Sequence, residues 1–122
     1  HVIYDVFVEQ PAMMFRGGKT TAFTMATLQR FNGMTCYIAY KVFEMEAELV
    51  NPLSARSVLG IKVPRGIPPK DKKRFIIERM AERFDGSFKY EMTRQQNPQP
   101  GTDDRADALV VALAGPLLFH EE

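Results

Sequence analysis

Three carboxylates near the two ends of the chain have types and spacings that suit metal-dependent chemistry. Asp104 and Asp107 are three residues apart in a segment with helical periodicity, so they share one face of that predicted helix. Glu9 ends an apolar run that is typical of a buried strand. Carboxylate oxygens are the ligands that Mg²⁺ and Mn²⁺ prefer, and such ions activate water for phosphodiester hydrolysis. The three residues are therefore candidate metal ligands.

The acidic residues that open the last predicted helix also have a purely structural explanation. Carboxylates in a first helical turn accept bonds from free N–H groups and oppose the helix dipole. Against this, Ala108 and Val111 lie beside the aspartate pair, which indicates that the pair borders a buried region. An unpaired charge is costly there, and a metal ion would compensate it. For Glu9, the structural alternative is a solvated strand end.

The elements that must position these residues alternate between strand-like and helix-like patterns. The predicted order is strand 2–9, helix 20–43, strand 46–50, short helix 54–59 after Pro52, helix 70–84 and helix 103–113, which Pro116 ends. Residues 88–92 form a strand or a loop edge, and 95–102 form a polar linker. This alternation predicts one α/β domain over residues 1–122 with a partly parallel sheet.

Two features of the long predicted helix are informative. Its second half is apolar nearly all round, so we expect it to be buried against a sheet or a partner. Cys36 lies in this stretch and is predicted to be a core residue. Gly33 costs about 1 kcal/mol in a helix relative to Ala. We therefore expect either a break at Asn32-Gly33 or a close contact at that point.

Composition limits the class of protein. The 122 residues carry a formal net charge of +1, so overall charge does not indicate a nucleic-acid partner. A local basic patch comprises Lys62, Arg65, Lys70, Lys72, Lys73 and Arg74. A single cysteine excludes an intrachain disulfide and a cysteine-based zinc site, and it is typical of a reducing compartment. Without a transmembrane or signal segment, the expected setting is intracellular (cytoplasmic, viral or organellar), away from membranes.

The ordered motifs resemble those of RuvC-like Holliday junction resolvases, which have the RNase H fold. Phe7-Val8-Glu9-Gln10 is similar to the family's strand end of two hydrophobic residues followed by Glu-Gln. The segment 104–112 (Asp-Arg-Ala-Asp-Ala-Leu-Val-Val-Ala) resembles the family's C-terminal helix. Between them, Gln29–Gly33 on a long helix, Asn51-Pro52 and Val58–Gly60 occur in the family's order.

The resemblance covers Asp5 to Ala114 and implies a four-carboxylate site, of which Glu9, Asp104 and Asp107 match three. The fourth, an aspartate on the first strand of the fold, precedes the glutamate by tens of residues in the family. The resemblance therefore implies a mixed sheet flanked by helices, with the N-terminal strands missing from this chain. It also implies Mg²⁺ or Mn²⁺, no small-molecule cofactor, a branched DNA substrate and a homodimer that matches the symmetry of a junction.

The family also has a lysine near the scissile phosphate, before the penultimate helix. Lys72 matches best by its spacing to Phe75, with Lys70 and Lys73 as alternatives. The structural alternative is a solvated helix start. Cations in this segment suit contacts to the DNA backbone. The predicted contacts are Arg65, Lys70 and Lys73, with Lys72 in the catalytic role.

The loop after the glutamate carries an apolar side chain that enters the junction in family members. The matching position here is Ala12, which departs from the pattern. The adjacent residues 13–15 (Met-Met-Phe) either wedge between bases or stack on them, or they pack beneath the loop. The DNA contacts predicted in this loop are Met14, Phe15, Arg16 and Lys19.

The resemblance thus implies a metal-dependent, structure-selective endodeoxyribonuclease that cuts Holliday junctions or other branched DNA in recombination and repair. Another RNase H-fold nuclease (RNase H-like, transposase-related or YqgF-like) is an alternative, because a fold does not fix its substrate. A second alternative is an inactive, truncated module that at most binds DNA.

Overall fold

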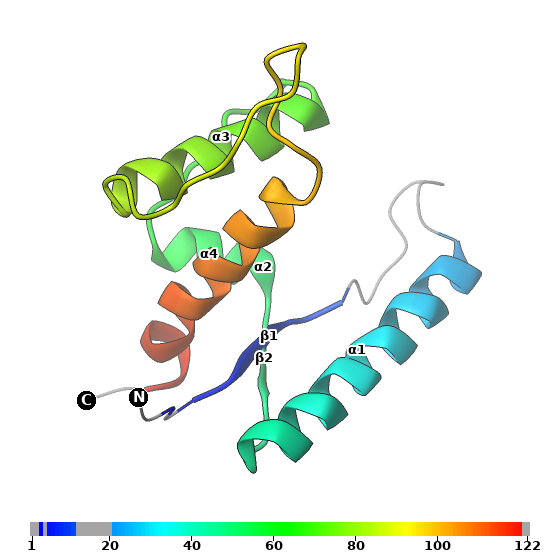
Figure 1. Cartoon of the computed structure of the whole chain (residues 1–122). Helices are drawn as coiled ribbons and strands as arrows, with labels where there is room; N and C mark the ends of the chain where they lie inside the picture. The colour runs from blue at the N-terminus through cyan, green and yellow to red at the C-terminus, as the bar shows by residue number, and fades with distance from the viewer. Residues whose placement is uncertain (1–2, 4, 12–20, 121–122) are drawn as a thin grey trace. The chain divides into compact units, whose positions relative to one another are not determined.

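The computed structural model describes residue 3 and residues 5–11 and 21–120. Within these residues the elements are β1 (Phe7–Glu9), α1 (Ala22–Phe43), β2 (Glu48–Val50), α2 (Pro52–Val58), α3 (Pro69–Arg83) and α4 (Thr102–Phe119) (Figure 1). The predicted mixed α/β class is confirmed. The chain divides into two compact units, His1–Asn51 and Pro52–Glu122, which are described separately below.

The first unit is a β-α-β arrangement in which β1 and β2 pair in parallel. Val8 lies opposite Leu49, and the Gln10 N–H donates to the Val50 carbonyl at 2.8 Å. Parallel neighbours need a long crossover, and α1 supplies it. Both strands are shorter than predicted. Residues 5 and 6 lie outside β1, residues 46 and 47 lie outside β2, and residues 2 and 4 are outside the described part of the chain.

α1 has well-formed caps at both ends. The Thr21 hydroxyl accepts a hydrogen bond from the Thr24 N–H, and Glu44, at φ 57°, donates its N–H to the Tyr40 carbonyl. The predicted alternatives at Gly33 are both wrong. The helix continues through it, and an added Cβ would meet nothing within 4 Å. One glycine costs only about 1 kcal/mol, which a 22-residue helix with regular bonds on both sides tolerates.

α1 was predicted to be buried against a sheet or a partner. Burial against the sheet is wrong, because none of its residues is buried within the chain, and burial against a partner stays a prediction. Cys36 is half-buried rather than a core residue. Size gives the reason: a helix of this length extends about 33 Å, whereas a three-residue strand extends about 10 Å. The sheet therefore cannot cover the helix. Large apolar side chains form an exposed stripe, defined here as Phe23, Phe31, Met34, Ile38 and Val42.

The second unit packs α2 and α3 against α4 (Figure 1). Its buried apolar residues are Ala55 on α2, Ile76, Ile77 and Met80 on α3, Phe88 in the following loop, and Ala106, Val110, Val111 and Ala114 on α4. Small residues on α4 allow its neighbours to approach closely. α3 starts with Pro69, whose missing N–H costs nothing in a first turn.

α4 differs from its prediction at the C-terminal end. It was expected to stop before Pro116, but Pro116 lies inside the helix, which continues to Phe119. The His120 N–H donates to the Pro116 carbonyl at 2.9 Å. Ala114 and Gly115 are buried just before the proline, and this packing holds the helix in place. Residues 117–119 are therefore helical.

Residues 88–92, between α3 and α4, form no strand. Of the two predicted alternatives, a strand or a loop edge, the loop edge is correct. An isolated antiparallel bridge joins Met92 to Pro98. Within that bridge, the Thr93 N–H donates to the Asn97 carbonyl at 2.6 Å and closes a turn. The predicted polar linker is therefore ordered by its own backbone bonds. No helix in the described ranges is both long and apolar enough to cross a membrane.

Candidate active site

The first turn of α4 carries two of the predicted acidic residues. Asp103 and Asp104 lie in this turn, and the N-cap residue, Gly101, provides no side-chain acceptor. Thr102 is buried, and its hydroxyl donates to the Gln99 carbonyl at 2.7 Å. Because the helix lacks a side-chain cap, the first-turn carboxylates also compensate the exposed N–H groups and the dipole. Structural and metal-binding roles are compatible at this position.

Asp104 and Asp107 lie one turn apart on α4 with different exposure. Asp104 is exposed, whereas Asp107 is half-buried. Of the apolar residues predicted beside the pair, Val111 is buried and Ala108 is exposed. The prediction that the pair borders a buried region therefore holds on the Asp107 side only. The pair extends from the packed face of α4 to the solvent.

An ion pair brings the basic start of α3 to the acidic start of α4. Lys73 Nζ lies 3.5 Å from Asp103 Oδ2, with side-chain exposures of 67% and 29%. An exposed pair of this kind contributes only about 0–1 kcal/mol, so its importance is positional. Two segments that sequence reasoning assigned to one site, the lysine cluster and the aspartates, meet within the second unit. Lys70 and Lys72 are exposed in the same first turn of α3.

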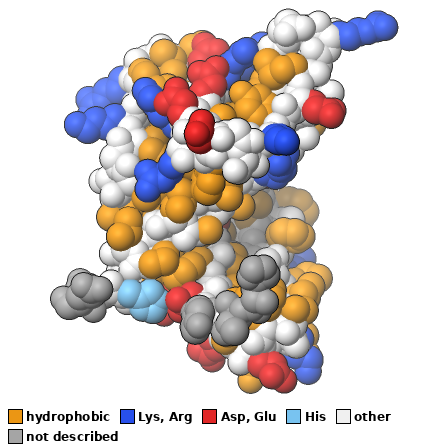
Figure 2. Space-filling view, turned by 60° about the vertical axis from the view of Figure 1, so that its left-hand side comes forward, with side chains coloured by type: hydrophobic (Ala, Val, Ile, Leu, Met, Phe, Trp, Pro, Cys, Tyr) orange, Lys and Arg blue, Asp and Glu red, His pale blue; other side chains and the backbone are white. Residues whose placement is uncertain are grey.

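The rest of the predicted basic patch does not form one surface. Arg74 has a structural role: its Nε lies 3.3 Å from Glu78 Oε1, and its Nη1 donates to the Gln96 carbonyl at 3.2 Å. Arg65 is exposed in the loop before α3. On the face shown in Figure 2, Lys and Arg side chains lie among Asp and Glu side chains. Within the predicted patch, the start of α3 combines exposed lysines with a nearby carboxylate.

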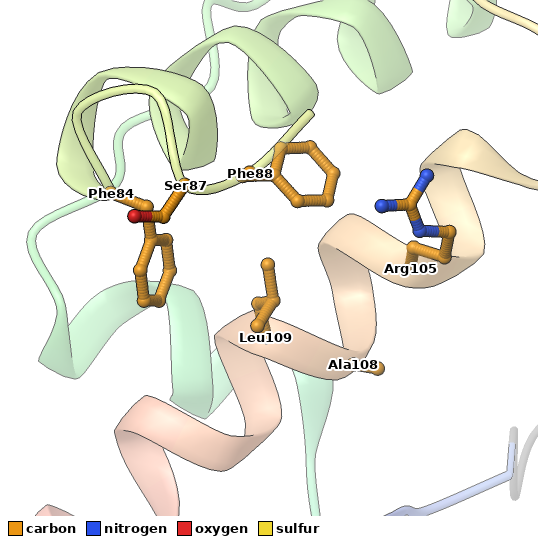
Figure 3. A pocket seen from close by; sticks show the side chains of 6 residues that line it. All are labelled: Phe84, Ser87, Phe88, Arg105, Ala108 and Leu109. Carbon is orange, nitrogen blue, oxygen red and sulfur yellow. The ribbon is translucent and has the colours of Figure 1, made fainter. Parts of the chain in front are cut away.

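Arg105, between the two aspartates in sequence, is directed to a different neighbour. Its Nη2 donates to the Lys89 carbonyl at 2.9 Å, and its guanidinium lies 5.0 Å from the centroid of the Phe88 ring. Figure 3 shows it at the edge of a pocket of about 440 Å³, lined also by Phe84, Ser87, Phe88, Ala108 and Leu109. Arg105 fixes the loop after α3 onto α4. Sequence reasoning gave it no role.

Glu9 belongs to the first unit, at the carboxyl end of β1. Its side chain is exposed, and its main-chain carbonyl accepts a hydrogen bond from Asn32 Nδ2 at 2.9 Å. The carboxyl ends of parallel strands are where α/β proteins place their sites. Asn32 therefore fixes the strand end that presents Glu9. The sequence contained this residue inside a family-like motif, but no signal indicated its contact.

The carboxylates have the donor chemistry that Mg²⁺ or Mn²⁺ accepts, since every one of them offers hard oxygen ligands. They belong to separate units: Glu9 to the first, Asp104 and Asp107 to the second. Among the described residues, no group of three Asp, Glu, His or Cys side chains is arranged to hold a metal ion. The aspartate pair thus supplies two donors from one helix. The loop residues Ala12, Met13, Met14, Phe15, Arg16 and Lys19 lie outside the described residues.

Comparison with known proteins adds no relative to this description. The chain matches no protein-family model, no curated protein and no solved structure. The RuvC-like resemblance thus stays a prediction that depends on the motifs and on the geometry above.

Proposed function

We propose that the chain is a domain of a RuvC-like, metal-dependent endodeoxyribonuclease that cuts Holliday junctions or other branched DNA. The observation that carries the proposal is the Lys73–Asp103 ion pair. It joins the lysine-rich start of α3 to the aspartate-bearing start of α4. A phosphodiester bound between cations and metal-binding carboxylates needs both kinds of group at one place.

The arrangement of the first unit supports an RNase H-like fold. β1 and β2 are parallel, α1 connects them, and Glu9 stands at the carboxyl end of β1. In the proposed fold these elements form part of a mixed sheet.

The proposal gives each side chain a separate role. Asp104 and Asp107 would hold Mg²⁺ or Mn²⁺, and the bound ion would activate a water and stabilise the leaving oxygen. Glu9 stays a ligand that the sequence motif predicts. Lys72 contacts the scissile phosphate, and Lys70 contacts a neighbouring phosphate of the same strand. Asp103 holds the Lys73 ammonium near α4 and so positions the start of α3.

The exposed stripe on α1 supports the homodimer in this proposal. Its five apolar side chains are between 58% and 81% exposed. α1 contains no Asp or Glu, so two copies of the stripe could meet without opposing carboxylates from this helix. A two-fold dimer presents two sites to a junction that has near two-fold symmetry itself.

A cleavage assay with synthetic DNA tests the proposal. The substrates are a four-way junction, a flap, a linear duplex and an RNA–DNA hybrid, each with Mg²⁺ or Mn²⁺. Asp107→Asn is expected to lower the rate of junction cleavage by about 100-fold or more, since it removes a charged metal ligand. The matched control is Asp85→Asn, which makes the same chemical change in an exposed loop residue of the second unit.

The outcomes separate the alternatives. Preferential cutting of the junction supports the proposal, and preferential cutting of the hybrid identifies another RNase H-fold nuclease. Junction binding without cleavage under either metal identifies the binding-only module. Equal cleavage by Asp107→Asn and Asp85→Asn contradicts the role given to the aspartates.

A further inference from the structure

A second pocket, whose lining includes no residue of α4, lies between the α2–α3 loop and α3. It has a volume of about 260 Å³. Its apolar surface comes from Leu59, Ile61, Phe75 and Met80. Met80 is 1% exposed and belongs to the core of the second unit, so the floor of the pocket is a fixed part of the fold.

Three cations surround this apolar surface. Lys62, Arg79 and Arg83 line the pocket, and no carboxylate is among its lining residues. Arg79 Nη1 lies 3.0 Å from Glu82 Oε2. In the described part of the chain, no carboxylate lies within ion-pair distance of Lys62 or Arg83. The pocket therefore carries an excess of positive charge that an anion would compensate.

The cations are held by ordered elements. The Arg79 guanidinium lies 4.8 Å from the centroid of the Phe75 ring, and most of its five N–H donors are left over after the bond to Glu82. Arg83 follows four residues later on α3 and so lies on the same side of the helix. The planar guanidinium fork of an arginine matches the geometry of phosphate oxygens.

The third cation comes from a turn that the backbone defines. Gly60 has a φ of +72°, a conformation that a side chain would strain, and it lies in the turn that follows α2. Hydrogen bonds from the Gly60 N–H to the Ser57 carbonyl and from the Ile61 N–H to the Arg56 carbonyl close this turn. Lys62 follows directly, so its main chain is anchored at the pocket.

We propose that this pocket binds a phosphate joined to a flat or apolar body, which is the chemistry of a nucleotide. The cations recognise the phosphate, and the apolar surface contacts the base or the sugar. The volume lies just below the range of about 300–1,000 Å³ typical of drug-sized ligands, so one nucleotide unit suits it better than a larger group. The nucleotide is either free or part of a DNA strand. The proposal does not use the carboxylates of α4.

Titration followed by ¹⁵N NMR tests the site with four probes: deoxyadenosine monophosphate, deoxyadenosine, inorganic phosphate and a short single-stranded oligonucleotide. The monophosphate is expected to shift the amide signals of Lys62, Arg79 and Arg83. Its binding should be at least about tenfold tighter than that of phosphate or deoxyadenosine, because each of these lacks one of the two contacts. Binding of the monophosphate identifies a free nucleotide as a source. Binding of the oligonucleotide alone, at the same amides, identifies a strand.

Matched variants test whether binding depends on the cations of the pocket or on any exposed cation of the protein. Lys62→Gln and Arg83→Gln are each expected to weaken binding by about tenfold or more. The controls Lys89→Gln and Arg94→Gln remove exposed cations that do not line the pocket, and they should leave binding unchanged. Any of three results would overturn the proposal. The controls could lose as much affinity as the pocket variants, phosphate could bind as tightly as the monophosphate, or no probe could shift the amide signals. Asp107→Asn should bind as the wild type does, so a failed nuclease proposal would leave this result intact.

Discussion

Replacing Pro116 by Ala is expected to stabilise the second unit. Pro116 lies inside α4, where it has no N–H to donate to the carbonyl four residues earlier and its ring crowds that carbonyl. Alanine would supply the missing donor and relieve the crowding. Because Pro116 is exposed, the substitution removes little packing.

The size of the effect follows from two opposing terms. Proline is about 3 kcal/mol less favourable than alanine in a helix interior. Removing a proline also frees the unfolded chain, which lowers stability by about 0.4–1 kcal/mol. Pro116 lies only three residues before the end of α4, where a helix frays. The cost of proline relative to alanine is therefore smaller there than in a helix interior. The free energy of unfolding is therefore expected to rise by about 1–2 kcal/mol.

Urea unfolding followed by circular dichroism at 222 nm measures this change. With a typical slope of about 2 kcal/mol per molar urea, the midpoint should rise by about 0.5–1 M at unchanged slope. Pro64→Ala is the matched control, because Pro64 lies in the α2–α3 loop, where no helical bond can be gained. It should lower stability by the entropic term alone. If Pro116→Ala lowers stability as Pro64→Ala does, α4 ends before Pro116 in solution.

Three further changes test other parts of the structure. A double-mutant cycle with Lys73→Gln and Asp103→Asn should give a coupling of about 0.2–1 kcal/mol in urea unfolding, and no coupling would mean that the starts of α3 and α4 do not meet. Met80→Ala should lower the free energy of unfolding by about 2–5 kcal/mol, because it leaves a cavity in the core, whereas a loss below 1 kcal/mol would contradict its burial. Asn32→Ala should cost about 0.5–1.5 kcal/mol and speed amide hydrogen exchange around Glu9, and unchanged exchange would argue against the bond between them.

Periodicity and local chemistry predicted the elements of the fold well. Pro52 was a correct indicator of a helix start, because proline suits a first turn, whereas α3 begins at Pro69, one residue before its predicted start. The errors came from features that depend on the surroundings. The sequence showed that Pro116 cannot donate a hydrogen bond, but not that burial of Ala114 and Gly115 would hold the helix past it. Likewise, the apolar second half of α1 predicted burial against a sheet or a partner, but not how short the strands beside it are.

The residues of the candidate site that belong to a motif could be predicted from the sequence. The contacts that bring distant residues together could not. The aspartates of α4 and the lysines of α3 could be proposed from spacing alone. The Lys73–Asp103 contact could not, because it joins residues thirty positions apart through the packing of two helices. The basic patch was assigned as one unit, yet Arg74 binds Glu78 and Lys62 lines a separate pocket with Arg79 and Arg83. Sequence clustering does not show which side of a helix each cation occupies.

The stripe on α1 has a thermodynamic consequence if a second copy covers it. Association that occurs only in the folded state adds to the free energy of unfolding through mass action, by about 1.4 kcal/mol for each tenfold rise in concentration above the dissociation constant. The midpoint of thermal unfolding would then rise with protein concentration. The stability of α1, which has no buried residue in the single chain, would thus depend on the protein concentration.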